Sequence, residues 1–357
     1  MEDDRLVVSN YNGKYYYNRV NSTSQNILCE KLTERHTVGD KILDTVLFPS
    51  GLSSIYYTTK CAIDEYKYRE NTVQLFYSDE LYCDTPFIMN SFYEKDKVEV
   101  EKFDVDNFKI NWDKKSAVII LAEACSNPNG KIFPFSKISD MRSQIPNLYI
   151  IIDNTWLTDI IFNPFIHNID AVCLSLTKYY SGGQCIAGAT IGLKSNIFSE
   201  IESIIHLVGL HVSPLNIDII IGNLDKMAEK IRASSKRTIE IINAIKKNVE
   251  VRHPFLADQS EINFNGIYPS VISFIVISSV NRFKKHCAKN LGAVEYKTSF
   301  GAKRTRIDTY PHKAGQGKTM GRIAVGFADD DFDEVLSEII EVSELGEIKM
   351  TIPLKKY

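Results

Sequence analysis

The sequence of 357 residues lacks several features that would assign it to a specialised class of protein. Neither sign of charge dominates, since the formal net charge at pH 7 is −3, and no binding to nucleic acid or to an anionic membrane is expected. The longest strongly apolar stretch, residues 271–280, contains serines and is too short to span a bilayer. There is no repeat or low-complexity segment. The composition, 44% hydrophobic and 24% charged, predicts an ordinary globular protein with room for two domains.

The seven cysteines include no Cys-x-x-Cys pair, and several lie in apolar runs. We interpret them as reduced thiols, so neither a disulfide framework nor a metal site is expected. The first residues are acidic and lack the apolar region of a signal peptide, which favours a cytoplasmic location. A phosphate-binding P-loop at 315–319 is excluded, because that motif requires a glycine where this sequence has His312.

What the sequence does contain is a group of three short apolar runs between residues 148 and 193, each bounded by turn residues. Each run has the length of a strand that is buried on both faces, as in a parallel sheet. The first run ends in Asp153 and the second leads to Lys178, and ligand sites of open α/β sheets lie at the carboxyl ends of strands. One acid and one amine at neighbouring strand ends are the minimum that pyridoxal phosphate (PLP) needs. The lysine binds the cofactor covalently, and the acid keeps the ring nitrogen protonated.

Two hydroxyl residues strengthen this prediction. Ser175 and Thr177 alternate with leucines just before Lys178, so their side chains would point the same way and could bind a phosphate. The glycine pair at 182–183 then allows a close approach of the backbone.

The pattern Ser-x-Thr-Lys-Tyr at 175–179, with Asp-Asn-Thr-Trp at 153–156, resembles the motifs of the Cys/Met-metabolism PLP-dependent enzymes, the family of the trans-sulfuration synthases and lyases. The resemblance implies the aspartate-aminotransferase-like fold type I, with a large, mostly parallel-sheet domain and a smaller α+β C-terminal domain. Strand–helix–strand alternation from 73 to 193 by itself predicts an α/β fold with a mostly parallel sheet.

The domain organisation follows from these elements. We expect an N-terminal arm over residues 1–25, a PLP-binding large domain over 26–228 and a C-terminal small domain over 229–357, with the boundary inside a long helix. The resemblance implies a homodimer with shared active sites and, as is usual in the family, a homotetramer.

The resemblance also implies which residues hold the cofactor. Backbone N–H groups at the start of a helix, together with hydroxyls and a neighbouring subunit's arm, would bind the phosphate. Tyr82 would stack on the ring, and Asn127 would bind its phenolic oxygen. The expected phosphate ligands are Ser50, Gly51, Leu52, Ser175, Thr177 and the neighbour's Tyr17 and Arg19.

The substrate would be a small amino acid. Arg322, in Arg-Ile-Ala-Val-Gly, resembles the arginine that binds the α-carboxylate, and Ser299 would assist it. Arg304 lies where many lyases of the family have a glutamate near the distal end of the substrate. If Arg304 lines the pocket, it favours a distal carboxylate or phosphate over a distal ammonium group.

The function implied is β- or γ-elimination, or γ-replacement, on sulfur amino acids or activated homoserine, with Lys178, Tyr82 and Asp153 as the catalytic residues. Two alternatives remain open at this stage. One is a PLP-binding relative that has lost catalysis and acts as an interaction protein, because the loop at 182–185 and the residues after Tyr82 depart from the family pattern. The other is a fold-type-I aminotransferase.

Overall fold

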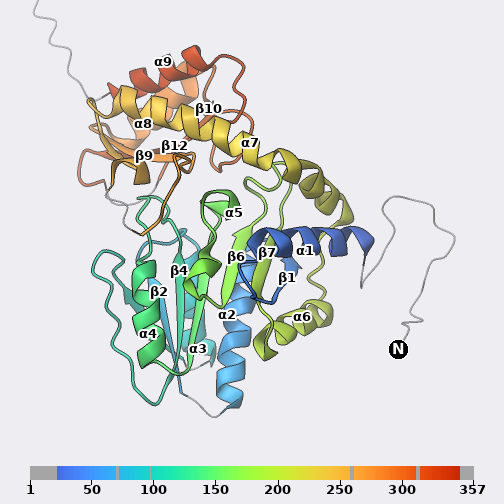
Figure 1. The fold of residues 1–357 in the computed structure, drawn as a ribbon. Coiled ribbons are helices and arrows are strands. Elements are labelled where there is room, and N and C mark those ends of the chain that lie inside the picture. Colours follow the sequence, from blue (N-terminus) through green and yellow to red (C-terminus); the bar gives the residue numbers. More distant parts are fainter. Residues whose placement is uncertain (1–21, 70–71, 97, 258–260, 311–313, 346–357) are drawn as a thin grey trace, which may run out of the picture.

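A computed structural model describes residues 22–69, 72–96, 98–257, 261–310 and 314–345. Two sheets organise this part of the chain, a larger one below and a smaller one above in the view of Figure 1. The larger sheet has seven strands in the order β1-β7-β6-β5-β4-β2-β3. Its strands are β1 (Leu43–Phe48), β2 (Val73–Ser78), β3 (Glu99–Phe103), β4 (Ala117–Glu123), β5 (Leu148–Asp153), β6 (Ala171–Ser175) and β7 (Gly188–Leu193).

The strands β3, β2, β4, β5 and β6 pair in parallel, whereas β7 runs antiparallel to both β6 and β1. Parallel neighbours place their carboxyl ends at one edge of the sheet. Asp153 and Glu123 are register partners there, at the last pair of the β4–β5 ladder. The mostly parallel sheet that the sequence predicts is therefore confirmed.

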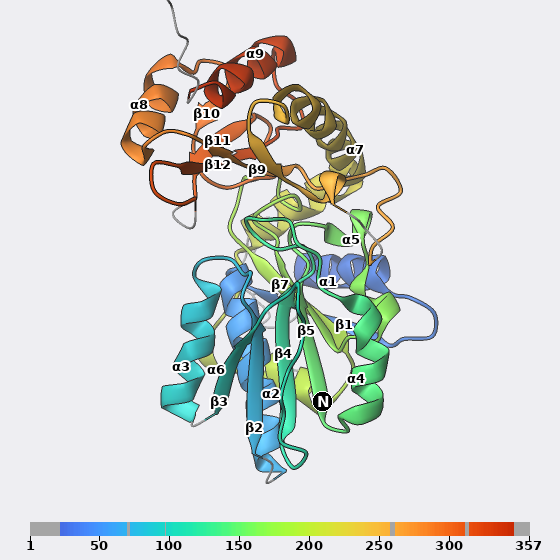
Figure 2. The same ribbon diagram turned by 90° about the vertical axis from the view of Figure 1, so that its left-hand side faces the viewer.

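Helices cover both faces of the large sheet (Figures 1 and 2). Successive residues of β4 show the reason, because Val118 and Ile120 pack into the core under one set of helices, while Ile119 and Leu121 pack under the other. The first set comprises α1 (Thr23–His36), α4 (Ile138–Gln144) and the start of α7 (Pro214–Ile245). The second comprises α2 (Gly51–Tyr68), α3 (Thr85–Asp96) and α6 (Asn196–Val208). Short helical segments are α5 (Thr158–Ile161), η1 (Phe135–Lys137) and η2 (Pro164–His167).

The smaller sheet has five strands in the order β10-β11-β12-β9-β8 and belongs to the C-terminal part of the chain. Helices α8 and α9 and the end of α7 pack against it. Its elements are β8 (Glu250–Arg252), η3 (Pro254–Leu256), β9 (Val271–Val276), α8 (Val280–Asn290), β10 (Glu295–Tyr296), β11 (Arg306–Thr309), β12 (Thr319–Ala324) and α9 (Phe332–Ser343).

Helix α7 connects the two parts (Figure 1). Its residues up to Ile231 contribute to the core of the large sheet, and those from Ile241 onward contribute to the core of the small sheet. We retain a domain boundary near residue 229 as a proposal, because the helix changes cores beyond that point. None of the helices in the described ranges is long and apolar enough to cross a membrane.

Candidate active site

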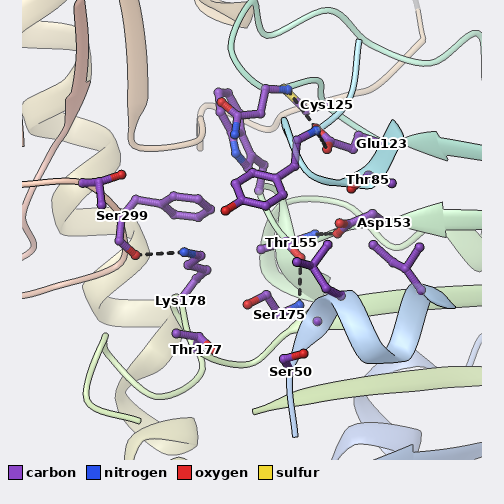
Figure 3. A pocket seen from close by; sticks show the side chains of 18 of the residues that line it. Ser50, Thr85, Glu123, Cys125, Asp153, Thr155, Ser175, Thr177, Lys178 and Ser299 are labelled. Carbon is purple, nitrogen blue, oxygen red and sulfur yellow. Dashed lines mark hydrogen bonds between the residues drawn. The ribbon is translucent and has the colours of Figure 1, made fainter. Parts of the chain in front are cut away.

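A cavity of about 270 Å³ lies at the carboxyl ends of β4, β5 and β6, beneath the smaller sheet. Figure 3 shows the side chains that line it, with Lys178 and Ser299 on one side and Asp153 and Glu123 on the other. The structure brings eleven of the predicted site residues to this cavity. They are Ser50, Gly51, Leu52, Tyr82, Asn127, Asp153, Ser175, Thr177, Lys178, Ser299 and Arg322.

One end of the cavity is formed by the start of α2. The Ser50 hydroxyl accepts a hydrogen bond from the Ser53 N–H, which caps the helix. The N–H groups of Gly51 and Leu52 belong to the same first turn, where a helix provides no backbone acceptor for them. A Cβ at Gly51 would lie 2.8 Å from the Cβ of Ser175, so only glycine lets the helix come this close to the end of β6. Helix N–H groups and nearby hydroxyls are suited to a phosphate.

Two carboxylates lie at the opposite wall. Asp153 is half-buried, and its Oδ1 accepts a hydrogen bond from the Thr155 N–H at 2.9 Å. Burial raises the pKa of Asp153, and the hydrogen bonds from Thr155, followed by the charge of Lys178, oppose this rise. Burial, together with the neighbouring Asp153, also raises the pKa of Glu123 well above its usual range. A cation at this place, such as a protonated ring nitrogen, would stabilise Asp153 in its charged form.

Lys178 follows β6 and extends toward the smaller sheet. Its Nζ donates to the Ser299 hydroxyl at 2.8 Å and lies 5.1 Å from the centre of the Phe300 ring. Ser299 itself has a φ of +78°, in the left-handed region that non-glycine residues seldom occupy. Burial, followed by the charges of Arg322 and Arg306, lowers the pKa of Lys178 to about 8.

Tyr82 and Asn127 are held by one side chain, the buried Glu123. Its Oε1 accepts the backbone N–H of Tyr82, and its Oε2 accepts the N–H of Asn127 at 2.8 Å. The Tyr82 ring is partly exposed to the cavity, and burial raises its pKa to about 12. Glu123 therefore joins the loop after β2 to the loop after β4.

Arg322 reaches the cavity from the smaller sheet and is 7% exposed. It forms an ion pair with Asp308 at 2.7 Å, and its Nη1 donates to the Asn127 Oδ1 at 3.1 Å. A buried arginine at the wall of a pocket suits recognition of a carboxylate.

Arg304 is not among the described residues that line the cavity. Its side chain is 47% exposed, and its Nη2 donates to Asp330 at 2.6 Å, away from the residues that line the cavity. The prediction that it contacts the distal end of a substrate is therefore corrected, because the acidic turn before α9 binds the guanidinium at the surface. Tyr17 and Arg19 of the predicted arm lie outside the described residues.

The structure adds pocket residues to which the sequence analysis assigns no role. Trp156 and Phe300 are buried and meet edge to face with ring centres 6.1 Å apart. Glu123 and Cys125 also line the cavity. Trp156 belongs to the motif at 153–156, and the other three lie within four residues of Asn127 or Ser299, but motif spacing does not tell which side chains turn inward.

The cavity fits PLP on three observations of this structure. The start of α2, where Gly51 packs too closely against Ser175 to allow a Cβ, lies at the cavity together with the hydroxyl residues Ser175 and Thr177. A half-buried carboxylate, Asp153, is available for the ring nitrogen. A lysine with a lowered pKa lies within the same cavity.

Comparison with known proteins agrees with this site. The model of the Cys/Met metabolism PLP-dependent enzyme family matches residues 2–330. A cystathionine beta-lyase of Schizosaccharomyces pombe is 28% identical over 141 residues, 39% of this chain and 36% of that protein. An L-methionine gamma-lyase of Fusobacterium nucleatum is 29% identical over 180 residues, 48% of this chain and 44% of that protein. The aligned segments thus span less than half the length of these two relatives.

The fold agrees over a longer range. A Campylobacter jejuni protein assigned as an O-acetylhomoserine (thiol)-lyase, with a structure that contains a pyridoxyl-lysine group, has a TM-score of 0.77 at 18% identity. The match covers 92% of this chain and 87% of that one. The chain therefore has PLP-dependent fold type I and belongs to the Cys/Met metabolism PLP-dependent enzyme family.

Proposed function

We propose that the protein is a PLP-dependent trans-sulfuration enzyme that eliminates or replaces a group at Cβ or Cγ of a sulfur amino acid or an activated homoserine. The observation that carries the proposal is the presence of Lys178, Asp153 and Arg322 in one cavity. These side chains supply an amine, an acid for the ring nitrogen and a cation for the α-carboxylate. When bound, PLP supplies an electron sink for a carbanion at the substrate Cα.

Lys178 is proposed as the group that moves protons. With a pKa of about 8 it changes between amine and ammonium close to neutral pH, which suits both accepting and returning a proton. The hydrogen bond to Ser299 directs its Nζ toward the side of the cavity nearest the smaller sheet. The Phe300 ring, with its centre 5.1 Å from Nζ, provides a favourable cation–π contact for the ammonium form.

The remaining residues orient the reactants. Asp153 would hold the ring nitrogen protonated, and Tyr82 would lie against the plane of the cofactor ring. The Tyr82 hydroxyl is protonated at neutral pH, and burial moves its pKa further from neutrality, to about 12. Arg322 would bind the α-carboxylate, which fixes the Cα–H bond relative to Lys178.

A second copy of the chain is proposed to complete the phosphate site. Among the cavity-lining residues of the described chain the cations are Lys178 and Arg322, and both have other roles in this proposal. The phosphate dianion then needs a cation from elsewhere, and Arg19 with Tyr17 of a neighbouring subunit's arm would supply it. This implies a homodimer with shared sites, and we propose a cytoplasmic homotetramer built from two such dimers.

Mixed dimers test this arrangement. Arg19→Ala chains and Lys178→Ala chains should each be inactive or weak, and mixing them should restore activity, because one of the two shared sites then carries neither change. Subunit exchange is verified by mass spectrometry of tagged chains. Exchange without any recovery of activity would contradict a shared site.

A substrate screen tests the proposed reaction. The purified chain with PLP is incubated with cystathionine, cysteine, methionine and O-acylated or phosphorylated homoserine, and pyruvate, 2-oxobutyrate and thiol are measured. We expect at least one substrate to release a keto acid or to exchange its γ-substituent, with no product from Lys178→Ala. Binding of PLP without any product would favour the non-catalytic relative. Conversion of 2-oxoglutarate to glutamate would favour the aminotransferase.

A further inference from the structure

Arg322 has several partners besides the predicted site residue Asn127, and the chief one is Asp308. It lies on β12, directly across from Asp308 on the antiparallel strand β11. Cross-strand partners on the same face of a sheet have their Cβ atoms close together, so an acid and a base at these positions can meet without a long reach. A sequence motif points to Arg322, whereas Asp308 belongs to none of the motifs.

The contact between the two side chains is bidentate. The Arg322 Nε donates to Asp308 Oδ1 at 3.1 Å, and Nη2 donates to Oδ2 at 2.7 Å. The side chains are 7% and 14% exposed, so water competes little for this pair. One edge of the guanidinium, formed by Nε and Nη2, is therefore occupied by Asp308.

The other end of the guanidinium points to the cavity. Nη1 donates to Asn127 Oδ1 and Nη2 donates to Thr298 Oγ1, each at 3.1 Å, and both acceptor residues line the cavity. Asp308 is not among the cavity-lining residues of the described chain. The Tyr310 ring covers a face of Arg322, with its centre 5.3 Å from the guanidinium carbon. Arg322 is thus held along one edge and one face, and its Nη groups remain at the wall of the cavity.

We propose that Asp308 is a positioning residue for the carboxylate subsite, which fixes the guanidinium of Arg322 so that the α-carboxylate of an amino-acid substrate takes over the Nη1 and Nη2 donors that now bind Asn127 and Thr298. The proposal rests on the proposed function, in which Arg322 binds that carboxylate. An arginine side chain has many rotamers, and ordering it only when the substrate arrives would weaken binding. Because Asp308 binds the guanidinium in the folded protein, Arg322 is already ordered before a substrate arrives.

The proposal separates two kinds of ligand, which gives a direct test. L-Methionine carries the α-carboxylate, and 3-(methylthio)propylamine is the same molecule without it. Binding of each to the PLP-loaded chain is measured from the change in cofactor absorbance, for wild type, Asp308→Ala and Asp308→Asn. We expect Asp308→Ala to raise the Kd for L-methionine about tenfold while the Kd for the amine changes less than twofold. Asp308→Asn retains the shape and one acceptor, so an intermediate effect is expected.

Kinetics and a matched control complete the experiment. With the best substrate of the screen, Asp308→Ala should raise KM more than it lowers kcat, and Asp308→Glu should restore part of the loss. Asp330→Ala is the control, because Asp330 pairs with the exposed Arg304 of the same domain. It should change neither Kd.

The outcomes distinguish the inference from the proposed function. Equal weakening of both ligands in Asp308→Ala, or an unchanged Kd for L-methionine, would overturn the positioning role. A wild-type chain that binds the amine as tightly as L-methionine would overturn the carboxylate subsite itself. Absence of product in the substrate screen, with L-methionine still bound more tightly than the amine, would count against the proposed reaction and leave the role of Asp308 in place.

Discussion

The two sheets contribute to the cavity in different ways. The large sheet delivers Asp153 and Ser175 from the last residues of parallel strands, where backbone ladders set the position of each side chain. The smaller sheet delivers Arg322 from within a strand, and an ion pair with Asp308 decides where its guanidinium lies. A position set by backbone hydrogen bonds follows from the strand itself, whereas a position set by side-chain pairing depends on the partner.

Mutations in the two parts of the cavity should therefore have different effects. Changes in the large-sheet part of the cavity should alter how PLP is held. Changes in the small-sheet part should alter how a substrate is bound while PLP remains.

Lys178→Ala should abolish covalent attachment of PLP, because no other amine of the described chain lines the cavity. Borohydride reduction of the wild-type chain with PLP, followed by peptide mass spectrometry, should label Lys178. Lys303→Ala, which removes an exposed lysine of the C-terminal domain, should leave the labelling unchanged. Label on a lysine other than 178 would show that the cavity is assigned wrongly.

Attachment of PLP to the cofactor-free chain should depend on pH through Lys178. The neutral amine is the reactive form, and burial with the nearby Arg322 and Arg306 lowers its pKa to about 8, whereas Asp153 and Asp308 oppose this shift. The rate should therefore rise roughly tenfold per pH unit below 8 and level off above it. Stopped-flow absorbance measures the rate from pH 6 to pH 9.5. A rate that continues to rise to pH 9.5 would mean that the amine has the ordinary pKa of an exposed lysine.

Glu123→Gln should weaken PLP retention about tenfold, because only one of the two oxygens that accept the backbone N–H groups of Tyr82 and Asn127 remains. Equilibrium dialysis measures the retained PLP. Glu338→Gln is a matched control, since Glu338 also accepts backbone N–H groups, those of residues 292–294, but in the C-terminal domain. The control should lower thermal stability without changing PLP retention, and equal loss of PLP in both variants would contradict the division between the two parts.

Arg304→Glu should have the smallest effect. Its side chain is exposed and paired with Asp330, so the ratio of kcat/KM for an anionic homoserine ester to kcat/KM for cystathionine should not change. The comparison uses purified wild type and mutant with PLP. A drop of about tenfold in that ratio would place Arg304 in contact with substrate after all.

The prediction from sequence was most successful where apolar periodicity and strand ends carry the information. Asp153 at the end of β5, Asn127 after β4 and Lys178 after β6 all line one cavity, as the strand ends predict. The prediction was weakest between Ser299 and Arg322, where residues of loops and short strands carry the charges. The position of Arg304 along its motif predicts a pocket contact, but Asp330, 26 residues further on, binds it at the surface.

By itself the sequence determined the mostly parallel sheet, the acid and the lysine at neighbouring strand ends, and the glycine at the start of α2, because buried strands and helix starts depend on local residue pattern. Only the tertiary structure decided the antiparallel register that pairs Asp308 with Arg322, and the two bonds by which Glu123 joins Tyr82 to Asn127. Asp308 and Arg322 are 14 positions apart in the sequence, and Tyr82 and Glu123 are 41 positions apart. Packing and burial decide which residues pair in this way, because an unpaired buried charge destabilises the fold. A local sequence pattern does not contain this information.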